Sequence, residues 1–239
     1  MCTFYWNQCG KINVYVRRLG TQEWTDKMAD LFCVKLGETM RGKFAERVKQ
    51  YAYGEALLVL PNRFLLQSEQ QRGTVRAVNM DYLPNEILRA NNRDSFAMLS
   101  RRSQEIIVRK LIDDKKEAGE LNYLHSIADA DSFAKIVTGF IGELSRAGTT
   151  AEEFAEALSA WERRNGYCLK DEEISSIYTD YRKMLKKNNW YDIDGLYRLA
   201  TIELQNSDCI IPWQTLYFSD FYQFDHLQLD FITAIKDKC

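Results

Sequence analysis

Hydrophobic residues in the first third of the chain form short runs that polar and glycine-containing segments interrupt. The run Ala56–Leu60 is apolar at every position, which is typical of a parallel strand buried on both faces. Asn62 follows this run and can cap a helix. Strands are therefore predicted at residues 32–36, 56–60 and 74–79, and helices at residues 43–53 and 63–72. This alternation predicts an α/β fold with a parallel sheet and crossover helices.

The pattern becomes helical after Asp81 and stays so to Asn206. One amphipathic stripe consists of Phe133, Ile136, Val137, Phe140, Ile141 and Leu144. Ser100 is expected to cap one helix, and Thr150 with Glu153 forms a capping box that begins another. Further helices are predicted over residues 174–185 and from Asp192 or Asp194 to Gln205. We expect each apolar stripe to pack in a core.

The last segment returns to an α/β pattern, with a strand predicted at residues 215–219 and a helix through Ile235. A large helical segment is thus inserted between strands that can share one sheet. We predict three regions: the first part of an α/β domain at residues 1–80, an inserted helical subdomain at residues 81–206, and a return to the sheet at residues 207–239. Because the chain stops soon after this last strand and helix, we expect it to be truncated.

The composition of the chain excludes several classes of protein function. The 239 residues are 46% hydrophobic and 28% charged, with a net charge of −2, so the chain lacks the basic character of an autonomous DNA-binding domain. Nucleic acid stays possible as a ligand of a larger assembly that contains this chain.

The cysteines and histidines predict no metal site. No two of the six cysteines have CxxC spacing, and the two histidines, His125 and His226, belong to no recognisable motif. Without a signal peptide or a membrane span, we expect a soluble cytoplasmic protein.

A degenerate phosphate loop is the first candidate for chemistry. Gly37, Gly42 and Lys43 match the G-x-x-x-x-G-K pattern, whose backbone N–H groups and lysine bind phosphates. Phe44 replaces the Ser or Thr hydroxyl that binds Mg²⁺ in such loops. A chance Gly-Lys turn and a former nucleotide site are both compatible with this segment.

The predicted strand at residues 215–219 leads to a second damaged motif. A Walker-B strand ends in Asp followed by Glu, which together order Mg²⁺ and activate water. Here Asp220 is followed by Phe221, so the general base for hydrolysis is missing. Two nucleotide-site motifs occur in the expected order, and each lacks a residue that catalysis needs. No catalytic residue is therefore assigned, and only residual binding of ATP and Mg²⁺ is conceivable.

The chain resembles the N-terminal part of AddB-type subunits of bacterial helicase–nucleases, from residue 32 to the end. The segments that carry this resemblance are GETMRGKF, ALLVLPNRF, LSRRSQEIIVRKLI, IYTDYRKMLKKNNWYDIDGLYRLA and TLYFSDFYQFDHLQLDFITAI. Phe221 and Phe224 match aromatic positions of the family, whereas Phe44 and Tyr222 depart from its pattern. The first 30 residues do not align.

The resemblance implies a partial RecA-like sheet with a large helical insertion, in an inactivated helicase region ahead of a nuclease domain. It implies a non-catalytic scaffold in double-strand-break repair that contacts DNA and a motor partner subunit. Asn62 and Arg63 are the expected contacts to the single-strand backbone, because they follow a strand's carboxyl end, where open α/β sheets bind ligands.

Two alternatives remain open at this point. The first is an active P-loop ATPase or nucleotide kinase with an unusual Mg²⁺ ligand, which would need polar groups near Phe44 and Phe221. The second is a helical protein-interaction module, which would apply if the α/β pattern were wrong. Four aromatic residues are candidates for base stacking, although core packing is favoured for most of them: Trp190, Tyr191, Trp213 and Tyr217.

Overall fold

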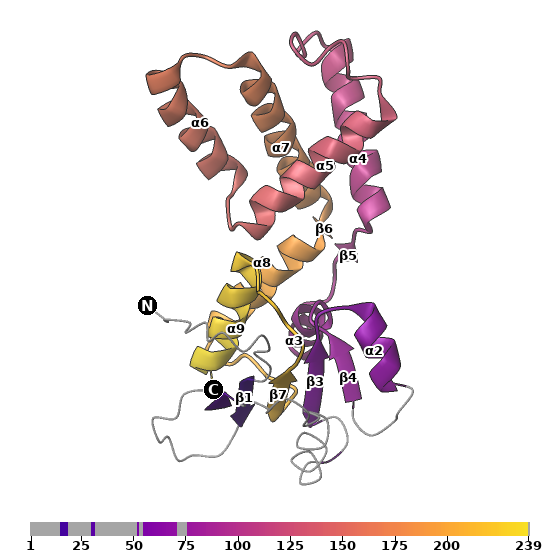
Figure 1. The fold of residues 1–239 in the computed structure, drawn as a ribbon, viewed down its shortest axis with the longest axis vertical. Coiled ribbons are helices and arrows are strands. Elements are labelled where there is room, and N and C mark those ends of the chain that lie inside the picture. The colour runs from indigo at the N-terminus through magenta and orange to yellow at the C-terminus, as the bar shows by residue number, and fades with distance from the viewer. Residues whose placement is uncertain (1–14, 19–29, 32–51, 53–54, 71–75, 239) are drawn as a thin grey trace. The chain divides into compact units, whose positions relative to one another are not determined.

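The computed structural model describes residues 15–18, 30–31, 52, 55–70 and 76–238 (Figure 1). The predicted strand at residues 32–36 and the phosphate loop with Gly37, Gly42 and Lys43 lie outside the described residues. The described elements are β1 (Tyr15–Arg18), β2 (Asp30–Leu31), β3 (Ala56–Leu60), α2 (Arg63–Gln70), β4 (Arg76–Asn79), α3 (Tyr82–Ala90), β5 (Ala97–Met98), α4 (Arg101–Glu117), α5 (Asp131–Arg146), α6 (Ala151–Asn165), α7 (Leu169–Asn188), β6 (Trp190–Tyr191), α8 (Ile193–Gln205), β7 (Thr215–Phe218) and α9 (His226–Lys238).

The main sheet has the strand order β2-β1-β7-β3-β4. β3 runs parallel to both of its neighbours, with Leu58 opposite Ala77 on β4 and Tyr217 on β7. All five residues of β3 are buried, and Leu57 and Val59 have no exposed surface. The prediction of a buried parallel strand at residues 56–60 is therefore confirmed, and so is the α/β class.

One edge of the sheet was not predicted from the sequence. β1 pairs antiparallel with β7, where Arg17 lies opposite Leu216, and β2 pairs antiparallel with β1. The sheet is therefore mixed rather than purely parallel. The expectation of a parallel sheet was wrong at this edge because the pairing joins opposite ends of the sequence, which a local hydrophobic pattern cannot reveal.

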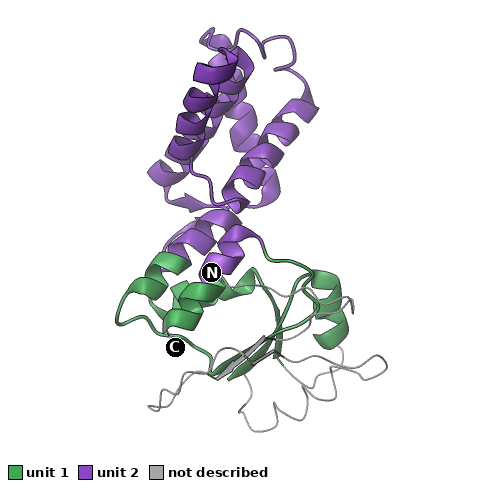
Figure 2. Cartoon of the chain, turned by 60° about the vertical axis from the view of Figure 1, so that its left-hand side comes forward, with its two compact units in different colours: residues 1–92, 201–224, 232–239 green, residues 93–200, 225–231 purple. Residues whose placement is uncertain are grey.

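The chain divides into two compact units (Figure 2). Unit 1 consists of residues 1–92, 201–224 and 232–239, and its described part contains the main sheet with α2 and α3. Unit 2 consists of residues 93–200 and 225–231 and contains α4, α5, α6 and α7. The domain boundaries predicted from the sequence, at residues 80 and 206, stay a prediction.

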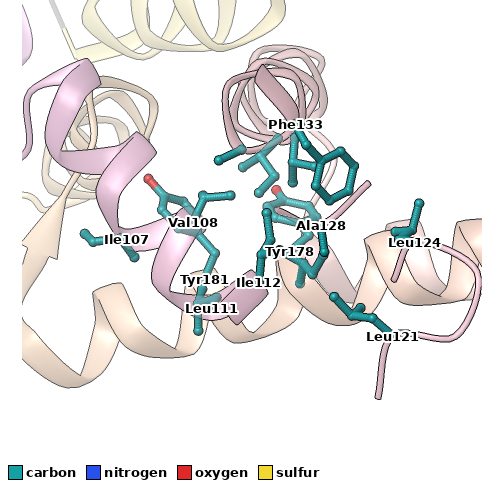
Figure 3. Close-up of a cluster of buried hydrophobic side chains, with 14 of the residues drawn as sticks. Ile107, Val108, Leu111, Ile112, Leu121, Leu124, Ala128, Phe133, Tyr178 and Tyr181 are labelled. Carbon is teal, nitrogen blue, oxygen red and sulfur yellow. The ribbon is translucent and has the colours of Figure 1, made fainter. Parts of the chain in front are cut away.

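Unit 2 has its own hydrophobic core, formed mainly by α4, α5 and α7 (Figure 3). Helix α4 contributes Ile107, Val108, Leu111 and Ile112, and α7 contributes Ile177, Tyr178, Tyr181 and Leu185. Leu121, Leu124 and Ala128 reach the same core from the connection between α4 and α5. The apolar stripes predicted from helical periodicity in this part of the chain are therefore core-forming, with one exception on α5.

The stripe of α5 is only partly buried. Phe133, Val137 and Ile141 are buried as predicted, but Ile136 is 66% exposed and Phe140 is 37% exposed. The buried face also carries the small or polar residues Ala134, Thr138, Gly142 and Ser145. These residues allow close packing, so the inward-facing side of α5 is rotated away from the apolar stripe that periodicity indicated.

Helix ends in unit 2 follow the local sequence signals. Ser100 accepts a hydrogen bond from the Ser103 backbone N–H at 3.1 Å, which caps α4. The capping box at the start of α6 is complete: Thr150 Oγ1 accepts from the Glu153 N–H at 3.1 Å, and Glu153 accepts from the Thr150 N–H at 2.8 Å. At the start of α8, Asp192 accepts from the Gly195 N–H at 2.7 Å. These predictions from sequence are confirmed.

Candidate nucleic-acid interface

The candidate site is the edge of the main sheet where three parallel strands end. β3, β4 and β7 run in the same direction, so the segments that follow them emerge at one edge. The ladder extends one residue past β4 and one past β7: the Met80 N–H donates to the Leu60 carbonyl at 3.1 Å, and the Ser219 N–H donates to the Val59 carbonyl at 3.1 Å. The backbone at this edge is thus held in register before the chain turns away.

The segment after β3 presents three polar or aromatic side chains to solvent. Asn62 Oδ1 accepts from the Leu65 N–H at 3.0 Å, which caps α2 as the sequence predicted. The side chains of Asn62 and Arg63 are exposed, and Phe64 is 79% exposed in the first turn of α2. A guanidinium group and a largely exposed aromatic ring therefore lie on adjacent residues at this edge.

The segment after β7 turns sharply at Asp220. This residue has a φ of 62°, in the left-handed region that Asp adopts more readily than most non-glycine residues. Its exposed carboxylate accepts a hydrogen bond from Ser219 Oγ at 2.9 Å. After β4, in the same way, Asn79 Oδ1 accepts from the Asp81 N–H at 2.8 Å and closes a turn.

Aromatic packing occupies the position where a second acid would be needed. Phe221 stacks on Phe224 with ring centroids 4.6 Å apart, and both rings contact Phe218 edge-on at 6.0 Å. Phe221 is thus part of an aromatic cluster and has no group that could orient water. Tyr222, between the two stacked residues, is 96% exposed. The segment displays a carboxylate and a phenol ring, without a general base next to Asp220.

The chemistry of these donors fits a nucleic-acid surface better than a metal centre. Asp220 could supply one oxygen to Mg²⁺, but the residues predicted to bind phosphate lie outside the described part of the chain. Within the described residues, no cluster of three or more His, Cys, Asp or Glu side chains could hold a metal ion. The exposed ring of Phe64 next to the Arg63 guanidinium group is, in contrast, a pair of the kind that stacks a base and contacts a phosphate.

The structure brings Asn62, Arg63 and Asp220 to one edge. It does not expose the aromatic residues considered from sequence, because Trp213 and Tyr217 are buried and Trp190 and Tyr191 are half-buried. The exposed rings are Phe64 and Tyr222, which sequence reasoning did not single out as base contacts. The sequence signal available for Phe64 was its place directly after Arg63 in the first turn of the predicted helix. Its exposure, on a helix without a buried residue, is known only from the structure.

None of the described helices combines the length and the apolar character that a membrane crossing requires. In comparisons with known proteins, a family model described as ADDB, N-terminal, matches residues 39–239. The matched region includes β3, β4, β7 and every described helix. No curated protein matches the sequence.

Proposed function

Because the chain belongs to the ADDB N-terminal family, we propose that it is the non-catalytic, helicase-like part of a helicase–nuclease subunit that repairs DNA double-strand breaks. Family membership implies a role in a helicase–nuclease repair complex. In the proposed role the chain holds the DNA strand and a motor partner subunit, and the partner hydrolyses ATP. The parallel arrangement of β4, β3 and β7 supports a RecA-like ancestry of the sheet.

The observation that carries the DNA-binding part of this proposal is the set of exposed groups at the carboxyl edge. Arg63 offers a charged donor to phosphate, and Phe64 and Tyr222 offer two largely exposed rings to bases. Base stacking on an aromatic ring contributes about 1–3 kcal/mol per base and tolerates any sequence. This edge is therefore suited to hold a single strand without reading its sequence.

The absence of catalysis is supported by the second motif. Phosphoryl transfer depends on metal positioning and on a group that orients the attacking water. At Asp220 the next residue is Phe221, whose ring stacks on Phe224. A general base contributes roughly 10²–10⁴ in rate, so its loss alone would suppress hydrolysis. The missing hydroxyl at Phe44, known from sequence, would remove a Mg²⁺ ligand as well.

Binding of a labelled single-stranded oligonucleotide to the purified chain tests the DNA contact. The variant Arg63→Ala is expected to weaken binding by about tenfold, the loss typical of one charge-assisted hydrogen bond. Arg89→Ala is the matched control, since Arg89 is an exposed arginine of the same unit in the last turn of α3. Its guanidinium group forms an ion pair with Glu86 at 3.4 Å. Equal effects of the two variants would contradict a specific contact at Arg63.

ATP turnover tests the non-catalytic role. The purified chain, with Mg²⁺ and single-stranded DNA, is expected to hydrolyse no ATP above background. DNA-stimulated turnover that disappears in Lys43→Ala would overturn this role and would favour an active P-loop ATPase. Nucleotide binding without turnover would leave the proposal standing, because backbone N–H groups and a lysine can hold phosphates without the metal.

A further inference from the structure

Two arginine side chains of unit 2 meet over the C-terminal half of α5. Arg101 is the first residue of α4, and Arg146 lies in the last turn of α5. Their Nη1 atoms lie 3.6 Å and 3.2 Å, respectively, from the position that a Cβ atom would take at Gly142. Arg101 Nη2 lies 3.6 Å from the corresponding position at Gly139. Because neither glycine has a Cβ atom, both guanidinium groups can approach the α5 backbone.

The negative charges around these guanidinium groups only partly balance them. Arg101 Nε lies 3.6 Å from a Glu105 carboxylate oxygen, and the Arg101 side chain is 51% exposed to solvent. Arg146 makes no ion pair within the described part of the chain, and its attraction to the buried Asp194 acts at longer range. Arg198 adds a third guanidinium group nearby, whose Nη2 donates to the Ser145 carbonyl at 3.3 Å.

The position of Arg101 and Arg102 is unfavourable for α4 as an isolated helix. The first turn of α4 contains Arg101 and Arg102 and no acidic residue. Positive charges at a helix N-terminus oppose the helix dipole, which prefers anions at that end. Two guanidinium groups that converge on one glycine also repel each other. An anion bound between them would relieve both effects, so the arrangement points to an anionic ligand.

We propose that Arg101 and Arg146 clamp a phosphodiester group of the DNA backbone. The planar fork of a guanidinium group matches phosphate oxygens with two parallel hydrogen bonds. The guanidinium groups themselves lie over the two glycines. Both arginine side chains are exposed, so a phosphate can reach them from the solvent side. This inference rests on the proposed DNA-binding function and adds to it a contact in unit 2, separate from the carboxyl edge of the main sheet in unit 1.

The first test removes the two charges in the full 239-residue chain. Anisotropy of a labelled oligothymidylate is measured for the double variant Arg101→Ala/Arg146→Ala over a range of salt concentrations. Affinity is expected to fall about tenfold or more, and the slope of log K against log salt is expected to shrink by about 0.7, the value for one phosphate contact on a single strand. Arg163→Ala/Arg164→Ala, at the exposed end of α6, removes the same charge and is expected to leave both quantities nearly unchanged.

The second test leaves the charge intact. A methyl group introduced by Gly142→Ala would lie 3.2 Å from Arg146 Nη1, so this guanidinium group must shift by a few tenths of an ångström and the spacing of the two arginines changes. Alanine favours a helix more than glycine does, so the melting temperature is not expected to fall. DNA affinity is expected to fall several-fold even so. Gly139→Ala is the matched control, because its methyl group would meet Arg101 only at an ordinary contact distance of 3.6 Å.

The possible results separate this clamp from the carboxyl edge. If Arg63→Ala weakens binding and Arg101→Ala/Arg146→Ala acts no more strongly than its α6 control, the clamp is overturned and the edge stands. The reverse result supports the clamp and removes the edge. If the wild-type chain binds no DNA, both are overturned. An oligonucleotide with a neutral methylphosphonate backbone should bind the double variant and the wild type with equal affinity. If the double variant still bound this neutral oligonucleotide about tenfold more weakly than the wild type does, the phosphate clamp would also be overturned.

Discussion

At the scale of single residues, Glu173 orders the connection between α4 and α5. It is 4% exposed, and its two carboxylate oxygens accept hydrogen bonds from three successive backbone N–H groups, those of Asn122 at 2.7 Å, Tyr123 at 2.8 Å and Leu124 at 2.9 Å. One buried carboxylate thus satisfies three donors that have no helix or strand partner. With this backbone held, Leu121 and Leu124 are fixed in the core of unit 2.

We predict that Glu173→Gln lowers the free energy of unfolding by about 1–3 kcal/mol, because an amide has one acceptor oxygen and leaves at least one of the three N–H groups without an acceptor. Urea denaturation followed by circular dichroism measures the change. Hydrogen exchange should also speed up at the three amides. Glu143→Gln, at an exposed position of α5, is the control and should change stability by less than about 0.5 kcal/mol. Equal effects of the two variants would argue against this role of Glu173.

Asp194 gives unit 2 a dependence on pH. Burial raises the pKa of this carboxyl from its ordinary value of 3.8 to about 7, and the neighbouring Asp192 carboxylate adds to the increase. Arg146 and Arg198 act in the opposite direction. Because the folded state keeps a proton that the unfolded chain releases near 3.8, stability is lost as the pH rises from that value to about 7.

We therefore predict that Asp194→Asn raises the free energy of unfolding by about 1–3 kcal/mol near pH 8 and has little effect near pH 4, since the neutral amide avoids the buried charge. Denaturation midpoints of wild type and variant at the two pH values measure the difference. Asp230→Asn changes an exposed acid of the same unit and should show no such pH dependence. A gain that is the same at both pH values would contradict a raised pKa at Asp194.

At the scale of elements, the end of α5 shows how a helix stop depends on tertiary packing. The Gly148 N–H donates to the Ser145 carbonyl, and the Thr149 N–H donates to the Leu144 carbonyl, both at 3.0 Å, as in a Schellman motif. Gly148 has a φ of +81°, and a Cβ atom there would lie 2.5 Å from Cδ2 of His226. This position therefore requires glycine both for its backbone and for its neighbour.

Gly148→Ala is predicted to lower the free energy of unfolding by about 2–4 kcal/mol, from the left-handed backbone and the steric overlap together. Gly119→Ala separates the two causes, because Gly119 also has a positive φ, +73°, but has no atom within 4 Å of the Cβ position. It should cost about 1 kcal/mol. Thermal denaturation compares the variants, and His226→Ala added to Gly148→Ala should recover part of the loss. No recovery would show that the overlap contributes nothing.

At the scale of the whole molecule, the main sheet joins distant parts of the chain. Val16 on β1 lies opposite Asp30 on β2 and Tyr217 on β7, so one residue takes part in two ladders. Without β1, the unpaired backbone groups of β7 would form an open edge, which is a template for association with other chains.

We predict that Val16→Pro lowers the melting temperature and causes concentration-dependent aggregation, since proline removes a ladder N–H and restricts the backbone. Differential scanning fluorimetry and light scattering measure the two effects. Val16→Thr is the control, because threonine keeps the N–H and favours strands, and it should leave light scattering at the wild-type level. If Val16→Pro behaved like Val16→Thr, β1 would not protect the edge of the sheet.

The sequence by itself determined the features of this protein that depend on neighbouring residues. The caps at Asn62, Ser100 and Thr150 were predicted because each bonds a backbone group three residues away. The burial of β3 was predicted because a run of five apolar residues leaves no polar face for solvent. The order of the predicted strands also placed Arg63 and Asp220 after strands that could end at one edge.

Only the tertiary structure decided which surfaces are covered. It paired β1 with β7 and β5 with β6, in registers that join residues far apart in sequence. It left Ile136 and Phe140 exposed on α5, because the inward face follows from the neighbouring helices rather than from apolar content alone. It also left Tyr222 open to solvent and brought Arg101 to Arg146 over Gly142. Exposure and side-chain proximity depend on the packing of distant segments, and local periodicity contains no information about that packing.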